Sequence, residues 1–268
     1  MIPGLLDAPA NLRCVVLGSG SGGNAVVVES GGRRILLDAG FSCRELERRL
    51  RWVGVEPDTI EALVLSHEHG DHVRGADRFL RRHPVPVLAS EGTLVGTALG
   101  DRARELAVTV RSGMPVEVGP FRIEPFSVPH DAREPLGLVV EEPGGRRLGL
   151  AGDMGSRSRL AWARLKEVDM LLLETNHDLE MLRGGPYPWS LKQRVAGRVG
   201  HLSNREAAEG LPELVHDRLE WVVLYHLSRT NNSPELAAAL MGEALDQEGS
   251  RARLVVSDQF EPTPWLEV

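Results

Sequence analysis

The stretch SHEHGDH, from Ser66 to His72, places three histidines, a glutamate and an aspartate within seven residues. The whole chain of 268 residues has only nine histidines, and a solvated surface loop does not need this density. In an extended turn, residues two apart point the same way, and imidazole and carboxylate groups are ligands for Zn²⁺ and similar divalent ions. The spacing therefore predicts that His67 and His69 bind one ion and that Asp71 and His72 bind a second.

The pattern His-x-His-x-Asp-His directly after the apolar segment EALVLS, residues 61–66, resembles the mark of the metallo-β-lactamase superfamily. The resemblance covers nearly the whole chain. It implies an α/β fold, a four-layer αββα sandwich, in a single domain over residues 1–268. It also implies that the remaining ligands follow later strands, as His130 in FSVPHD, Asp153 in LGLAGDMG and His226 in VVLYHLS.

The same resemblance assigns the ligands to two divalent ions, Zn or Mn. His67, His69 and His130 would hold one ion, Asp71, His72 and His226 the other, and Asp153 would bridge them. Without the resemblance, His130 could equally be a turn residue. Asp38 in ILLDAG matches an early aspartate of the family, for which we expect a supporting role in orienting the ligand loop through hydrogen bonds.

Four segments of the second half point to a narrower group: ETNHD (174–178), YPWSLKQRV (187–195), GHLSNREAA (200–208) and HLSRTNN (226–232). Together with GSGSGGN (18–24), they resemble the YycJ/WalJ group of exonucleases and phosphodiesterases, which is related to RNase Z. That resemblance implies a 5′ to 3′ exonuclease acting on DNA more than on RNA. The expected partner is therefore nucleic acid.

Glu174 and His201 match an order found in RNase Z enzymes, in which such a pair is linked to proton transfer to the leaving group. From the residues alone, Glu174 could instead cap a neighbouring segment. His201 could simply precede a helix, because Ser203 and Glu206 form the capping-box pattern S-x-x-E. These alternatives stay compatible with catalysis, since a helix N-terminus also favours an anionic phosphate.

The expected mechanism is attack on phosphorus by a metal-bridging hydroxide, since bound ions lower the pKa of water toward about 7. Asp71, Glu174 and His201 are the candidate catalytic residues. The candidate substrate-binding residues are Ser228, Asn231, Asn232, Lys192 and Arg194.

Other segments give weaker signals. GSGSGGN contains G-x-G-x-x-G, but a strand follows it where a dinucleotide site needs a helix, which favours a hairpin turn. The remaining functional reading is a backbone that lines a phosphate. Residues 42–52, 73–82 and 203–216 are expected to be helical, and His83 and His216 to lie at the surface.

The bulk composition narrows the class of protein. A net charge of −7 argues against non-specific nucleic-acid binding over the whole surface, although a local basic groove remains possible. Cys14 and Cys43 fit a reducing compartment. No apolar run reaches the roughly 18 residues of a membrane span, and the start MIPGLLDAPANLR lacks a signal-peptide pattern. We expect a cytoplasmic protein with no membrane partner, and the sequence does not give its oligomeric state.

Three alternatives to a DNA exonuclease remain open. The first is an RNA-processing nuclease of the RNase Z kind, although no long tRNA-binding arm is evident. The second is a small-molecule hydrolase such as a thioesterase or lactonase, because one fold hosts many chemistries. The third is a binding protein without activity, against which the filled ligand positions argue.

Overall fold

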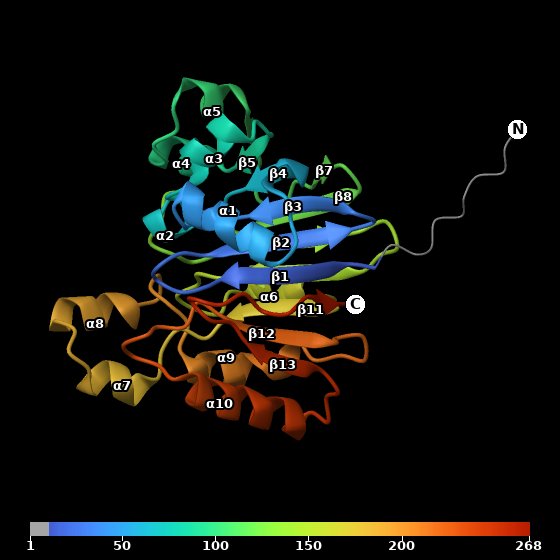
Figure 1. The fold of residues 1–268 in the computed structure, drawn as a ribbon. Helices are drawn as coiled ribbons and strands as arrows, with labels where there is room; N and C mark the ends of the chain where they lie inside the picture. The colour runs from blue at the N-terminus through green and yellow to red at the C-terminus, as the bar shows by residue number, and fades with distance from the viewer. Residues whose placement is uncertain (1–10) are drawn as a thin grey trace, which may run out of the picture.

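The computed structural model describes residues 11–268 (Figure 1). Residues 1–10 lie outside this description. They include most of the segment for which we expected no signal peptide. Two 7-stranded sheets dominate the structure. The strands of the first sheet, in spatial order, are β14 (Leu266–Glu267), β1 (Arg13–Gly18), β2 (Ala25–Ser30), β3 (Arg33–Leu37), β4 (Ile60–Val64), β5 (Val87–Ala89) and β6 (Ala107–Thr109).

The second sheet carries the middle and the end of the chain. Its strands, in spatial order, are β13 (Arg253–Val256), β12 (Trp221–Tyr225), β11 (Met170–Glu174), β10 (Arg147–Ala151), β9 (Leu136–Glu141), β8 (Phe121–Ser127) and β7 (Val116–Val118). The helices are α1 (Cys43–Trp52), α2 (Gly70–Val73), α3 (Ala76–Arg82), α4 (Glu91–Gly96), α5 (Asp101–Glu105), α6 (Arg159–Leu165), α7 (Leu179–Gly184), α8 (Trp189–Val195), α9 (Asn204–Gly210) and α10 (Pro234–Gln247).

Alternation along the strands builds the layers. In β1, Cys14 and Val16 point into a core shared with the second sheet, whereas Val15 and Leu17 point into a core shared with α1 and α3. The second sheet packs its outer face against α6, α9 and α10. Both faces of each sheet are thus covered, which explains the continuous apolar runs of the sequence. The predicted four-layer αββα sandwich is confirmed (Figure 1).

Parallel pairing places the functional loops at one rim. Strands β3 to β6 run parallel, and so do β10 to β13. Because the carboxyl ends of parallel strands meet at one edge, the loops after β4, β10, β11 and β12 gather there. Figure 1 shows α7 and α8 projecting from this same end of the molecule, on the side of α2.

The structure corrects two predicted helices. The segment 73–82 is interrupted at Gly75, where a Cβ atom would lie 2.3 Å from the carbonyl oxygen of Phe41, so the chain turns between α2 and α3. The segment 203–216 gives a helix only over Asn204–Gly210. Beyond it the chain narrows to a 3₁₀ turn over Leu211–Glu213 that contains Pro212, whose missing N–H disrupts a continuing helix.

His83 is also corrected. We expected it at the surface, but only 8% of it is exposed. Its Nδ1 contacts the Asp58 carboxylate, and its Nε2 lies 3.2 Å from Glu47 Oε1. His216 is half-buried, and its Nε2 bonds to the carbonyl oxygen of Val168 at 3.1 Å.

GSGSGGN forms the hairpin connection between β1 and β2, as predicted. The Gln259 side chain holds this loop, since its Oε1 accepts from Gly22 N at 2.6 Å and its Nε2 donates to Gly23 O at 2.9 Å. Gly20 adopts a φ of +129°, a value that side chains other than glycine rarely take. Within residues 11–268, no helix is long and apolar enough to cross a membrane.

Candidate metal centre

The histidines and aspartates predicted from the sequence converge at the shared strand-end rim. The loop after β4 supplies His67 and His69, and α2 supplies Asp71 and His72. The other candidate ligands follow strands of the second sheet: His130 after β8, Asp153 after β10 and His226 after β12. The centre therefore lies between the two sheets and draws on both.

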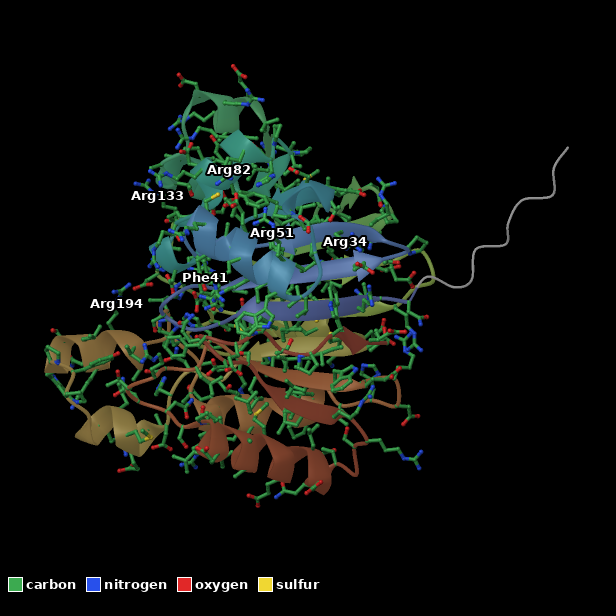
Figure 2. All side chains as sticks on the ribbon, in the orientation of Figure 1. Arg34, Phe41, Arg51, Arg82, Arg133 and Arg194 are labelled. Atoms are coloured by element: carbon green, nitrogen blue, oxygen red, sulfur yellow. The ribbon has the colours of Figure 1, made fainter. Side chains whose placement is uncertain are left out.

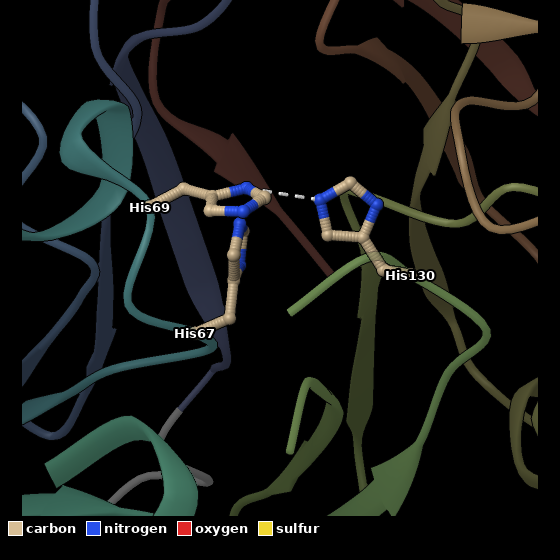
Figure 3. Close-up of side chains that lie close together, drawn as sticks. All are labelled: His67, His69 and His130. Atoms are coloured by element: carbon tan, nitrogen blue, oxygen red, sulfur yellow. Dashed lines mark hydrogen bonds between the residues drawn. The ribbon is translucent and has the colours of Figure 1, made fainter. Parts of the chain in front are cut away.

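His67, His69 and His130 form the first group (Figure 3). One donor atom from each lies within 4.8 Å of the others. His130 Nε2 lies 3.1 Å from His69 Nδ1, and the His67 ring is 4.7 Å from that of His69 between centroids. Three imidazoles facing one point form a donor set suited to a zinc-like ion.

Asp71, His72, Asp153 and His226 form the second group. Asp153 Oδ2 lies 2.9 Å from His72 Nε2 in this group and 3.2 Å from His67 Nε2 in the first. Asp71 Oδ2 lies 3.3 Å from His226 Nε2. Asp153 thus stands between the two groups, where a bridging carboxylate would have to be.

Hydrogen bonds behind the ligands orient their rings. His72 Nδ1 lies 2.7 Å from Asp38 Oδ2, and this aspartate also accepts from the backbone and the hydroxyl of Ser66. His130 Nδ1 lies 2.9 Å from the carbonyl oxygen of Gly200. With their Nδ1 atoms occupied, both rings keep Nε2 for the centre.

Backbone strain marks the same place. Among residues 11–268, Asp38 (φ 60°) and His226 (φ 57°) are the non-glycine residues with positive φ. Such a conformation costs about 1–3 kcal/mol and persists only where the surroundings impose it. At His226 the backbone N–H donates to Ser19 Oγ at 2.8 Å, which fixes the turn.

Backbone N–H groups at the ends of strands of the first sheet hold the ligand loop through hydrogen bonds. Asn24 N donates to Asp71 O at 2.8 Å, and Ala39 N donates to His72 O at 2.7 Å. Gly40 runs so close that a Cβ atom there would lie 1.7 Å from Asp71 O. Any larger side chain at residue 40 would push the ligand loop away.

Glu174 and His201 meet beside the second group. Glu174 Oε1 lies 2.7 Å from His201 Nδ1 and 3.1 Å from His226 Nδ1. Its Oε2 accepts from Met154 N at 2.7 Å and from Leu202 N at 3.0 Å, so the buried carboxylate is fully satisfied. The capping box of Ser203 and Glu206 begins α9 directly after His201, as predicted.

The carboxylates around His201 favour the protonated form of its ring. Burial alone would lower the pKa of His201, but the carboxylates of Glu174 and Asp153 outweigh that effect and raise it to about 9. Burial likewise opposes the charge of Glu174, yet His201 and then His226 lower the pKa of Glu174. His201 is 22% exposed at its side chain, so its ring reaches solvent while its Nδ1 stays bonded.

The chemistry of the first group also fits a metal. His67 Nε2 is buried and makes no hydrogen bond among the described residues. Burial, and then the neighbouring His72, lowers the pKa of His67 to about 4, so the ring is neutral at pH 7 with a free lone pair. An unpartnered neutral imidazole beside two others and a carboxylate is what a divalent cation requires.

The predicted substrate residues lie in two different settings. Asn231 and Asn232 are buried, and Asn232 Nδ2 donates to Thr175 O at 2.8 Å and to Asn204 Oδ1 at 2.8 Å. Ser228 Oγ accepts from Asn231 N at 3.1 Å. The side chains of Ser228 and Asn232 therefore brace the loop after His226, whereas the buried Asn231 side chain makes no hydrogen bond among residues 11–268.

Lys192 and Arg194 lie on the exposed arm made of α7 and α8. Lys192 Nζ donates to Arg183 O at 2.7 Å. Arg194 lies at the end of the molecule from which α8 projects (Figure 2), and its Nε lies 2.5 Å from Asp131 Oδ2. Asp131 Oδ1 lies 3.5 Å from His130 Nε2. This ion pair joins the arm to the loop that carries His130.

Three further residues at or near the centre were not predicted. Asp131 stands directly after His130 in the sequence, which is the signal that could have revealed it. Asn24 ends GSGSGGN, and its Nδ2 lies 3.1 Å from His72 Nε2. His177 is 1% exposed, and neither ring nitrogen has a partner among residues 11–268.

Comparisons with known proteins agree with this geometry. Residues 33–226 match the model of the family described as "Beta-lactamase superfamily domain". The chain is 33% identical over 244 residues to the exodeoxyribonuclease YycJ of Bacillus anthracis, covering 89% of this chain and 90% of that protein. It is 28% identical over 194 residues to the ribonuclease Z of Aeropyrum pernix, covering 66% and 56%. The solved metallo-β-lactamase-fold protein YhfI of Bacillus subtilis superposes with a TM-score of 0.70 at 17% identity, over 97% of this chain and 100% of that one.

Proposed function

The chain belongs to the metallo-β-lactamase superfamily as a metal-dependent hydrolase, and from this premise we propose that it is a two-metal nuclease, a 5′ to 3′ exonuclease on DNA. One observation carries the proposal. The ion pair of Glu174 and His201, with 2.7 Å between Oε1 and Nδ1, stands beside the candidate metal ligands with a raised His201 pKa. A protonated imidazole at that place suits the departure of an alcohol leaving group.

The residues present would hold two ions. His67, His69 and His130 would hold one, and Asp71, His72 and His226 the other, with Asp153 between them. When bound, the ions would activate a water molecule near neutral pH and offset the charge of the phosphodiester. Zn²⁺ and Mn²⁺ both accept this mixture of nitrogen and oxygen donors.

The chain's own residues would provide the proton and the orientation. Glu174 holds Nδ1 of His201, which leaves Nε2 to donate a proton to the 3′ oxygen of the nucleotide that is released, as the bond between that oxygen and the phosphorus of the next nucleotide breaks. A general acid of this kind contributes about 10²–10⁴-fold to the rate. Glu174 also contacts His226 at 3.1 Å, so one carboxylate would couple the orientation of a metal ligand to that of the acid.

The arm of α7 and α8 supports a polymeric substrate. Arg194, Lys192 and Arg198 place positive charge on or beside α8, and Trp189 is 70% exposed at its start. Exposed cations would meet phosphates, and an exposed aromatic ring would stack on a base. This surface favours a polyanionic strand over a small thioester or lactone.

DNA is favoured over RNA because the relative named an exodeoxyribonuclease aligns over 89% of this chain, whereas the ribonuclease Z aligns over 66%. RNA processing of the ribonuclease Z kind remains the second candidate, favoured by the Glu174–His201 pair.

The test uses duplex DNA and RNA of equal sequence, labelled at either end, with Mn²⁺ or Zn²⁺ added in turn. We expect stepwise shortening of DNA from the 5′ end and little cleavage of RNA. His226→Ala should remove the activity, while the matched variant His216→Ala, outside the centre, should keep it. Equal activity in His226→Ala would mean that a contaminant cleaves the DNA, and turnover of a thioester instead would contradict the proposal.

A further inference from the structure

A cavity of about 230 Å³ opens at the rim beside the candidate metal centre. It lies at the ends of β12 and β13, between the loop after His226 and the loop over residues 257–260. Among its lining residues are Ser19, Ser228, Arg229, Asp258 and Phe260. It is smaller than the roughly 300–1,000 Å³ of pockets for drug-sized ligands, and its size suits a single planar ring system.

The cavity and the metal centre share a wall. Ser19 lines the cavity, and its Oγ accepts the backbone N–H of His226 at 2.8 Å. Leu227 and Ser228, the next residues of the chain, also line it. A strand whose phosphodiester lies at the metal centre would therefore bring a neighbouring nucleotide over the cavity.

Arg229 and Phe260 form an exposed stack at this cavity. The guanidinium carbon of Arg229 lies 4.7 Å from the centroid of the Phe260 ring, which is 54% exposed. Within residues 11–268, Arg229 makes no ion pair with a carboxylate. The similar stack of Arg48 on Trp52, at 5.1 Å, differs because Arg48 is bonded to Glu45 at 2.7 Å.

The cavity is lined by residues of opposite charge, and hydrogen bonds hold part of its wall in place. Asp258 and Arg229 both line it, so a bare phosphate inside it would meet an acidic residue as well as a basic one. A nucleobase edge, in contrast, carries both donors and acceptors. Asp258 Oδ1 accepts from Glu261 N at 3.0 Å, and Gln259 is bonded to the β1–β2 loop, so both are held in place.

We propose that this cavity binds a nucleobase of the substrate strand next to the phosphodiester that is cleaved, with the base stacked on Phe260 and Arg229 facing the strand's phosphate. The inference rests on the proposed nuclease function and adds a base-binding subsite to it.

The test compares Phe260→Ala and Arg229→Ala with Trp52→Ala, a matched exposed aromatic–arginine stack on α1. The substrates are single-stranded oligonucleotides that carry one abasic site, moved stepwise along the first nucleotides. On intact oligonucleotides, Phe260→Ala should raise KM about 5- to 150-fold, the range that stacking on one aromatic side chain supplies. Trp52→Ala should leave KM unchanged.

The abasic series identifies the subsite. At one position, removal of the base should raise the KM of the wild-type protein as much as Phe260→Ala does. The same removal should not raise the KM of the Phe260→Ala variant further. An unchanged KM in Phe260→Ala, or an equal rise in KM at every abasic position, would overturn the base-binding subsite while the nuclease function stands. A wild-type protein that cleaves neither these oligonucleotides nor duplex DNA would overturn the nuclease function, and the subsite with it.

Discussion

At the scale of single residues, Glu174 contacts both a candidate metal ligand and the proposed general acid. It is fully buried and accepts from two backbone N–H groups, while its other oxygen faces the Nδ1 atoms of His201 and His226. The carboxylate thus orients both rings through their Nδ1 atoms, and at His226 it shares this contact with Asp153 Oδ1, which lies 2.6 Å from the same Nδ1. Its role is therefore distinct from that of the metal ligands, although it touches one of them.

This geometry predicts that Glu174 and His201 act as a unit. His201→Ala should lower kcat about 10²–10⁴-fold, the contribution of a general acid, while bound metal measured by elemental analysis stays unchanged. Glu174→Gln should lower kcat similarly. The double variant should be little worse than either single one, because residues that act together are not additive. If the two losses of kcat multiplied in the double variant, the paired role would be contradicted.

At this scale, sequence order carried the information on which candidate ligands come together. The seven candidate metal ligands come together as the resemblance implied, although which ring nitrogen faces the centre depends on partners that are distant in the chain, such as Gly200 O for His130. Asp131 was missed because its role depends on Arg194, 63 residues away. His83 was misjudged because Asp58 and Glu47 meet it only in three dimensions.

At the scale of elements, α1 shows how a short helix is anchored beside the glycine-rich loop. Ser42 caps it, Leu46 and Leu50 enter the core, and the buried Arg49 donates to Leu17 O at 2.7 Å. Its helical spacing made it predictable. The arm of α7 and α8 was not predicted, because its two short helices surround a Gly-Gly-Pro turn and bury little apolar surface.

Glu45 makes the stability of α1 depend on pH. Bonds to Arg48, and then to Arg49, lower the pKa of Glu45 from 4.5 to about 2, although its partial burial opposes this shift. The folded-state pKa is depressed, so the stabilisation is present above pH 4.5 and is lost as pH falls toward 2. Glu45→Gln should lower the free energy of unfolding by about 1 kcal/mol at pH 7, a difference that shrinks over this window.

Denaturant unfolding of wild type and Glu45→Gln at pH 7, 4 and 3 measures this change. Glu56→Gln is the matched control, because Glu56 pairs with Arg51 only at 3.5 Å and is 71% exposed. A difference between wild type and Glu45→Gln that stayed constant from pH 7 to pH 3 would show that the effect is not ionic.

At the scale of the whole molecule, the metal centre is a junction between two sheets. The first sheet presents His67, His69, Asp71 and His72, whereas the second presents His130, Asp153 and His226. The four-layer αββα arrangement followed from the resemblance. The short strands β6, β7 and β14 did not, because runs of two or three residues carry too little periodicity.

Ions bound at this junction should stabilise the fold as a whole. A ligand at about 100 times its Kd adds about 2.7 kcal/mol, which corresponds to roughly 5–10 °C in Tm for a domain of this size. Chelation of the metals should therefore lower Tm by about that amount and speed amide exchange in the loops of both sheets at the rim. In His67→Ala, which lacks a ligand, the chelator should shift Tm less. Equal Tm values with and without chelator, in protein shown by elemental analysis to lose its ions, would mean that the two sheets hold the rim in place unaided.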